Sequence, residues 1–272
     1  MNPLETVFRL RPGPLSVDQV RDALHGLITD LQWRPERFGT LARCDNVVVG
    51  DGVAQMVELY ARRGSLLIEG AEMEWFFLPD RPGKRTALGT VSWSWHVGKK
   101  PTKNLVDSHL ALAAKLATTL RSAYTRACLA SDEWNKTKRI VLVDAKSISP
   151  NALPGTAKQE VPKVRTIRNG LDALYWRNIL GPEFVAMFGD RLRSLPSDVA
   201  WDLGEGYWMV QPYATPADAA TEQGRARELE IVAHLGPECF YDDAEERSPT
   251  CAPDFYEEVD PLPPLMGFEN AN

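Results

Sequence analysis

Helical periodicity runs through five stretches of the chain, in which apolar residues recur every three or four positions. These stretches are residues 17–31, 53–60, 104–130, 183–188 and 224–235. The first begins after Ser16, with Gln19 three positions later, which is the pattern of a capping box. Gly64, Gly189 and Gly236 follow three of the others, where glycine commonly ends a helix.

A period of two, which is typical of a strand with one buried face, is clearest in residues 87–97. There Val91, Trp93, Trp95 and Val97 alternate with Thr90, Ser92, Ser94 and His96. Shorter apolar runs predict further strands at residues 5–10, 47–49, 66–69, 73–78, 139–143, 174–180 and 205–213. The order of the elements predicts an α+β protein with mixed, mainly antiparallel sheets and helices on one face. Trp93 and Trp95 are expected to be buried.

Residues 145–163 contain three prolines and little apolar pattern. A loop of this length is unusual inside a compact domain, so we predict a boundary there. The chain then divides into an N-terminal subdomain of residues 1–144, this connection, a C-terminal subdomain of residues 164–241 and an irregular acidic tail of residues 242–272. Each of the two packed subdomains is expected to hold its own sheet.

The formal net charge of −6 hides a separation of charge along the 272 residues. Residues 96–168 hold fourteen lysines and arginines against five acids, whereas residues 241–260 hold eight acids against Arg247 alone. Such fields affect association and the choice of partner rather than the fold. The content of hydrophobic residues, 44%, is that of a globular protein and excludes wholesale disorder.

Nothing in the sequence predicts export or insertion into a membrane. Residues 1–12 have no apolar stretch of the kind found in secretory signals, and no apolar run approaches the roughly 18 residues that span a bilayer. We therefore expect a cytoplasmic protein. Its four cysteines, Cys44, Cys128, Cys239 and Cys251, form no C-x-x-C pair and are expected to be reduced thiols.

The familiar signatures of enzymes are missing from the sequence, among them the P-loop, G-x-G-x-x-G, H-E-x-x-H and G-x-S-x-G. With four scattered histidines, no metal and no cofactor are expected, and His109 is interpreted as a buried core residue on an apolar helix stripe. Ser92, Ser94 and His96 share a strand face, and one hypothesis is a serine nucleophile with a histidine base. Strand residues two apart are about 7 Å from each other, however, so a solvated sheet face is the simpler interpretation.

Asp144 and Lys146 are the sharpest enzymatic candidates. They follow the apolar run 139–143, with Asp132 and Glu133 upstream, and a nuclease of the restriction-endonuclease fold needs two carboxylates for Mg²⁺ and a lysine near the attacking water. The basic segment around them would suit a phosphate backbone. The alternative is a salt bridge at the end of a strand.

The acidic tail interleaves carboxylates with aromatic residues, which could imitate a nucleic-acid backbone and dock on a basic protein partner. The residues that would make this contact are Asp242, Asp243, Glu245, Glu246, Asp254, Phe255, Tyr256, Glu257 and Glu258. The alternative is a solvated terminus.

The sequence from residue 90 to residue 242 resembles the immunity protein 52 family of bacterial polymorphic-toxin systems. The likeness is carried by Trp93, Trp95, Trp176, the stretch Gly181-Pro182-Glu183-Phe184, Phe188-Gly189 and Leu235-Gly236. The resemblance implies a cytoplasmic inhibitor, not an enzyme, that binds a toxin of a type VI or related secretion system. The implied toxin is a DNase effector of the restriction-endonuclease fold, with no direct contact of the inhibitor to nucleic acid or membrane. A metal-dependent nuclease using Asp144 and Lys146, or a scaffold without a toxin partner, are the alternatives.

Overall fold

The computed structural model describes residues 3–12, 15–30, 33–40, 43–70, 73–78, 88–95, 103–148, 155–163, 165–242, 245 and 247–255. The helices are α1 (Val17–Asp30), α2 (Val53–Arg63), α3 (Lys103–Thr119), α4 (Ala130–Thr137), α5 (Ala145–Ile148), α6 (Pro182–Phe188), α7 (Asp190–Arg193) and α8 (Glu222–Leu235), with 3-10 turns η1 (Pro216–Ala220) and η2 (Pro237–Cys239). The strands are β1 (Leu4–Pro12), β2 (Pro35–Thr40), β3 (Arg43–Val47), β4 (Leu66–Gly70), β5 (Met73–Leu78), β6 (Leu88–Trp95), β7 (Ser122–Leu129), β8 (Lys138–Asp144), β9 (Thr156–Pro162), β10 (Arg177–Leu180), β11 (Ala200–Gly204) and β12 (Tyr207–Val210).

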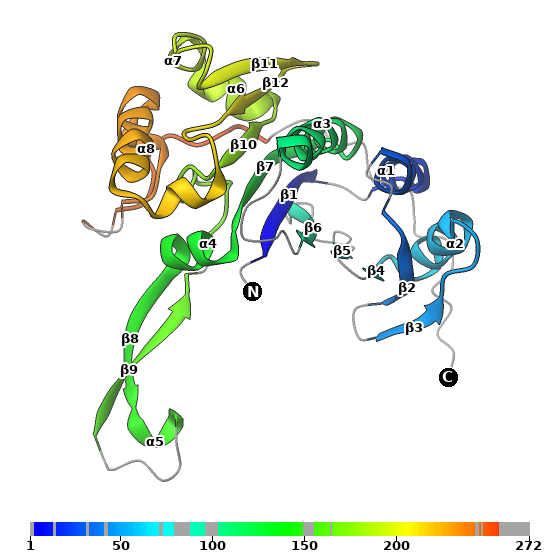
Figure 1. Ribbon diagram of the computed structural model, residues 1–272. Coiled ribbons are helices and arrows are strands. Elements are labelled where there is room, and N and C mark those ends of the chain that lie inside the picture. The colour runs from blue at the N-terminus through cyan, green and yellow to red at the C-terminus, as the bar shows by residue number, and fades with distance from the viewer. Residues whose placement is uncertain are drawn as a thin grey trace.

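Ten of these strands form one sheet in the order β11-β12-β10-β7-β1-β6-β5-β4-β2-β3, and the neighbouring strands are antiparallel. The α+β class is confirmed. The two halves of the chain share this sheet rather than holding one each, because β10 of the second half pairs with β7 of the first. Figure 1 shows the sheet curving from β11 to β3.

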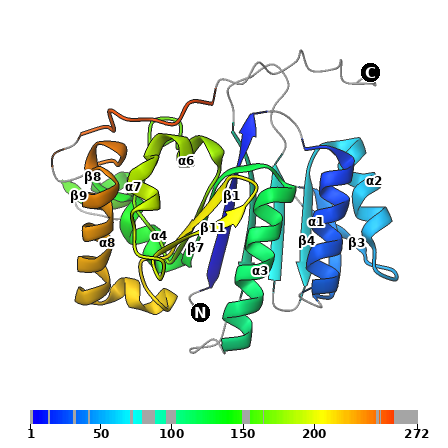
Figure 2. The same cartoon turned by 90° about the horizontal axis from the view of Figure 1, so that it is seen from above.

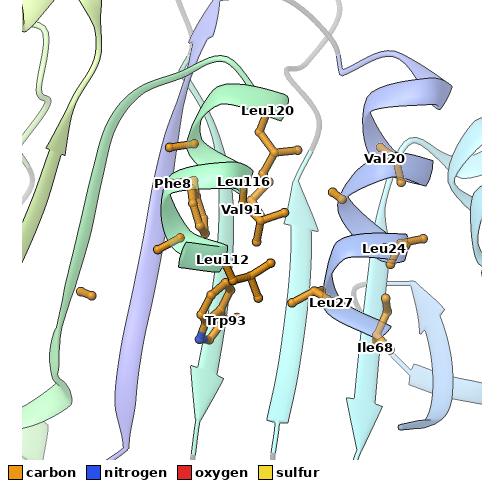
Figure 3. Close-up of a cluster of buried hydrophobic side chains, with 14 of the residues drawn as sticks. Phe8, Val20, Leu24, Leu27, Ile68, Val91, Trp93, Leu112, Leu116 and Leu120 are labelled. Atoms are coloured by element: carbon orange, nitrogen blue, oxygen red, sulfur yellow. The ribbon is translucent and has the colours of Figure 1, made fainter. Parts of the chain in front are cut away.

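Helices α1, α2 and α3 cover one face of the part of the sheet that the first half of the chain forms (Figure 2). Helices α1 and α3, with the residue that follows α3, bring the buried side chains Val20, Leu24, Leu27, Leu112, Leu116 and Leu120 to this face. Figure 3 shows them packed with Phe8, Val91 and Trp93 of the central strands. The capping box at the start of α1 is confirmed, because Gln19 N donates to Ser16 Oγ and Ser16 N donates to Gln19 Oε1. The predicted burial of Trp93 is confirmed; the Trp95 side chain lies outside the described residues.

A second core lies on the opposite face of the sheet. Ile179 and Leu180 are neighbours on β10 and therefore point to opposite faces. Ile179 belongs to the first core, and Leu180 packs with α6 and α8 in the second. The ring of Phe184 on α6 lies 5.7 Å from that of Tyr124 on β7. The sheet therefore joins the two cores as their common wall.

The predicted helix over residues 104–130 is wrong in its last part. Helix α3 ends at Thr119, and β7 begins at Ser122 and runs through the middle of the sheet. Arg121 takes a positive φ of 51°, which breaks the helix and redirects the chain. The apolar spacing of Leu120 and Tyr124 fits a helix as well as a strand, so the pattern alone did not separate the two.

Strands β8 and β9 form a separate two-stranded sheet, which extends away from the body with α5 at its far end (Figure 1). We call residues 138–162 the arm. The arm returns close to where it starts, because Lys138 pairs with Pro162 and Lys163 N donates to Thr137 O at 2.7 Å. The predicted connection of residues 145–163 thus contains α5 and β9 and belongs largely to a hairpin.

Candidate binding surface

The acidic tail is partly built into the body. Asp242 and Arg247 form a bridge through both backbones, and Arg247 Nη2 donates to Asp242 Oδ2 at 2.6 Å. Glu245, in the turn between them, and Asp254 are exposed. Asp243, Glu246, Tyr256, Glu257 and Glu258 lie outside the described residues.

Phe255, which was predicted to contact a partner, is not exposed in the structure described. Phe255 is buried in the second core, with its ring 6.2 Å from that of Phe184 and the guanidinium of Arg168 5.7 Å from its centre. An apolar ring that already fills the protein's own core gains nothing further by contact with a partner. Phe255 therefore fixes the middle of the tail to the body.

Asp144 and Lys146 lie at the far end of the arm. Lys146 N donates to Asp144 Oδ1 at 3.0 Å, which makes a local turn at the start of α5. Asp132 and Glu133 lie on α4 at the base of the arm, a full strand away, which is about 20 Å at the rise of a β-strand. The structure therefore does not bring these acids together, and the described residues contain no group of three His, Cys, Asp or Glu side chains placed to hold a metal ion.

Ser92 and Ser94 are half-buried on β6, and His96 lies outside the described residues.

His109, predicted as a core residue, is buried between the rings of Trp93 and Trp176, at 5.3 and 5.5 Å. Arg177 Nη1 lies 3.0 Å from His109 Nδ1, and Thr6 Oγ1 lies 2.9 Å from Nε2. Burial, with the charge of Arg177 second, lowers the pKa of His109 to about 3. His109 is therefore a neutral link between β1, α3 and β10. The four cysteines are free thiols.

Two large apolar side chains stand exposed on one face of the arm. Ile140 lies opposite Glu160 in the β8–β9 register, and Leu142 lies opposite Lys158. Directly opposed residues of an antiparallel pair point to the same face, so these four side chains form one surface. Ile140 is 60% exposed and Leu142 68%, and neither is part of the two cores.

Trp134 of α4 extends this surface toward the base of the arm. Trp134 is 40% exposed, and its Nε1 donates a hydrogen bond to Glu160 Oε2 at 3.0 Å. Lys138 Nζ donates to Glu160 Oε1 at 2.8 Å, and this bond, followed by that from Trp134, lowers the pKa of Glu160. We call the surface formed by Trp134, Ile140, Leu142, Lys158 and Glu160 the arm face.

The arm is also basic. Residues 138–162 hold four lysines and arginines against Asp144 and Glu160. Both carboxylates already accept hydrogen bonds from within this region, as described above. Arg139, Lys146 and Lys158 are exposed. The arm therefore presents apolar side chains together with positive charge.

The base of the arm is held by a buried ionic cluster. Lys136 Nζ, on α4, donates to Glu228 Oε2 on α8 at 2.8 Å and to Leu174 O at 2.6 Å, and it lies 3.3 Å from Asp132 Oδ2. Burial raises the pKa of both Glu228 and Asp132, against the charge of Lys136. The attraction of Lys136 therefore holds the buried Glu228 of α8 against α4.

Arg126 of β7 makes the second connection to α4. Its Nη2 is paired with Glu133 Oε1, and its guanidinium lies 4.9 Å from the centre of the Tyr175 ring. The ammonium of Lys136 also lies 4.9 Å from the centre of that ring. Helix α4 is thus bound to β7, to α8 and to the segment before β10, and the arm begins on a fixed support.

Sequence reasoning missed the arm face. The run of residues 139–143 was interpreted as an ordinary strand, and a continuous apolar run is the usual mark of a strand buried on both faces. The signal that could have found it is the combination of this run with the excess of positive charge around it.

A solved structure with a similar fold is that of the Pseudomonas aeruginosa T6SS protein PA0821. The TM-score is 0.56 at 12% sequence identity, and the match covers 86% of this chain and 72% of that chain. No family model matches this sequence, so the resemblance to the immunity protein 52 family is not confirmed, and no curated protein matches it. In the part of the chain that the structure describes, no helix is long and apolar enough to cross a membrane. At this level of identity the likeness concerns the fold: the chain folds like a protein of a type VI secretion system.

Proposed function

We propose that this chain is an immunity protein, which binds a toxin of a type VI secretion system and neutralises it in the cytoplasm. The observation that carries the proposal is the fold similarity to a T6SS protein over 86% of the chain. The resemblance of residues 90–242 to a family of toxin inhibitors points in the same direction. The proposed toxin is a nuclease of the restriction-endonuclease fold.

A test of this function starts from the genes adjacent to the gene for this chain, among which the proposal expects a toxin gene. The toxin domain is expressed in bacteria with and without this chain, and survival and plasmid integrity are measured. We expect survival only with the chain present, and a stable complex of the two purified proteins. Toxicity that persists despite expression of this chain, with no complex formed, would refute the proposal.

The runner-up, a metal-dependent nuclease, is tested with the purified chain alone. Plasmid DNA incubated with the chain and Mg²⁺ or Mn²⁺ is expected to stay intact. Cleavage that is abolished by Asp144→Ala or by Lys146→Ala would replace the inhibitor with an enzyme.

The carboxylates of the tail are proposed as contacts that speed association with a cationic toxin groove. Changing Asp242, Asp243, Glu245 and Glu246 to Asn or Gln should slow association and flatten its dependence on salt, because charge acts mainly on the encounter rate. Rate constants at two salt concentrations measure this. Unchanged rates would leave the tail as a solvated terminus.

A further inference from the structure

The arm has more exposed apolar surface than its position in the fold explains. Three of the large hydrophobic residues exposed on the described surface, Trp134, Ile140 and Leu142, lie together on the arm face. A two-stranded hairpin that projects into water is marginally stable at best by itself. Adjoining exposed apolar side chains with a polar rim are typical of interaction sites, whereas single ones are ordinary.

We propose that the arm face is a docking surface for the toxin, and that it takes an apolar patch rimmed with acidic side chains. This inference rests on the proposed function for the identity of the partner. The apolar part of this contact would be made by three exposed residues, Ile140, Leu142 and Trp134. The acidic rim follows from charge: Lys158 lies on the arm face, Arg139 lies on the opposite face of the same hairpin and Lys146 at its far end, and both acids of the arm are already hydrogen-bonded.

The base of the arm suits this role because it is fixed before any partner arrives. Lys136 and Arg126 connect α4 to the sheet and to α8 through buried contacts. A surface that is already ordered loses less conformational entropy on binding, which favours affinity. The positive rim would in addition steer an acidic patch toward the arm.

This contact is distinct from the proposed contact of the tail. The acidic tail would suit a cationic groove of the kind that holds DNA, whereas the basic arm requires an acidic surface elsewhere on the toxin. The arm would therefore add affinity and selectivity outside the groove.

The test compares substitutions at equally exposed positions of the full-length chain. In Ile140→Thr/Leu142→Thr most of the apolar side-chain atoms are removed, and the β-branched threonines still favour a strand conformation. Val47→Thr, at a residue 67% exposed on β3 at the edge of the ten-stranded sheet, is the matched control.

Binding of each variant to the purified toxin domain encoded by the adjacent gene is measured by interferometry. We expect the double variant to bind at least tenfold more weakly, or about 1.4 kcal/mol, and Val47→Thr to bind like the wild type. Arg139→Gln/Lys158→Gln should slow association at low salt and have little effect at high salt. Equal affinity of the wild type and the double variant would overturn the inference while leaving the proposed function intact.

If the wild type does not bind this toxin, the proposed function fails first, and two further measurements decide what the arm does. Sedimentation of the chain alone detects self-association, and titration with a fluorescent DNA duplex detects binding of nucleic acid. Loss of either interaction in the arm variants would assign the arm face to a second copy of the chain or to nucleic acid, against our inference. Absence of all three interactions would overturn it as well.

Discussion

Strands β7 and β8 differ in a way that their sequences do not predict: the more polar strand is buried, and the more apolar strand is not. The sequence of β7, SAYTRACL, includes Ser, Thr and Arg, yet seven of its eight residues are buried. The sequence of β8, KRIVLVD, has four consecutive apolar residues, yet none of its seven residues is buried. β7 lies between β1 and β10 with a core on each face, whereas β8 has β9 as its strand neighbour. Position in the fold, not polarity, decides burial here, and the apolar residues of β8 lie outside both cores.

The largest effect is expected in the core that β7 and its neighbours enclose. Trp93→Ala should lower the free energy of unfolding by about 3–5 kcal/mol, because a large buried ring is removed and the cavity is only partly refilled. Trp134→Ala, on the arm face, is the matched control and should change the melting temperature little. Thermal and urea unfolding measure both. Equal losses for the two variants would contradict the distinction between core and arm.

The ionic cluster at the base of the arm should come next. Lys136→Met keeps the size of the side chain but leaves Glu228 and Asp132 without their cation, at a cost of about 3 kcal/mol. Lys138→Met is the control, since its ion pair with Glu160 is more exposed and such pairs contribute little. Chemical unfolding measures the difference. If Lys138→Met were as destabilising as Lys136→Met, the arm would be more tightly integrated than its exposure indicates.

A smaller effect is expected from His109 as the pH falls. The unfolded chain protonates this residue near pH 6.5, whereas the buried imidazole stays neutral to about pH 3. Its contribution to stability is therefore complete above pH 6.5 and is lost as the pH decreases toward 3, by about 2 kcal/mol at pH 5. His109→Gln cannot titrate and should show a flatter dependence between pH 7 and pH 5 in urea unfolding. Parallel curves for the wild type and the variant would exclude His109 as the source.

The smallest effect on folding belongs to the arm itself. Ile140→Thr/Leu142→Thr should change the free energy of unfolding by less than about 0.5 kcal/mol per site, because both side chains are exposed and outside the cores. Urea unfolding of this variant beside Val47→Thr provides the comparison. A loss of several kcal/mol would mean that β8 depends on its apolar residues for folding, and the contrast with β7 would no longer hold.

Local signals in the sequence predicted several elements well. Ser16 and Gln19 marked the start of α1, and the short helix α6 lies between Gly181 and Gly189 as expected. Gly189 has a positive φ of 55°, a conformation that glycine adopts without strain. Such features depend on a few adjacent residues, so they can be predicted from a single sequence.

Features that depend on distant partners were not predicted. β2 and β11, which contain Pro35 and Gly204, have weak strand patterns and are formed by pairing with β4 and β12. The path of β7 is set by β1 and β10, which lie over a hundred and about fifty residues away in sequence. The arm face could not be predicted either, because an apolar run has the same sequence whether it is buried or exposed.

The meeting of the two ends of the arm has a consequence for how this protein can evolve. Thr137 and Lys163 are joined by a backbone hydrogen bond, so the body keeps the same two attachment points whatever sequence lies between them. A recombination event that exchanges residues 138–162 would replace the arm without altering the strands of the large sheet. Insertions at such sites, where the chain leaves and re-enters the surface at neighbouring points, are tolerated well. The arm can thus diversify as a cassette, while selection for a stable fold acts separately on the remainder of the chain.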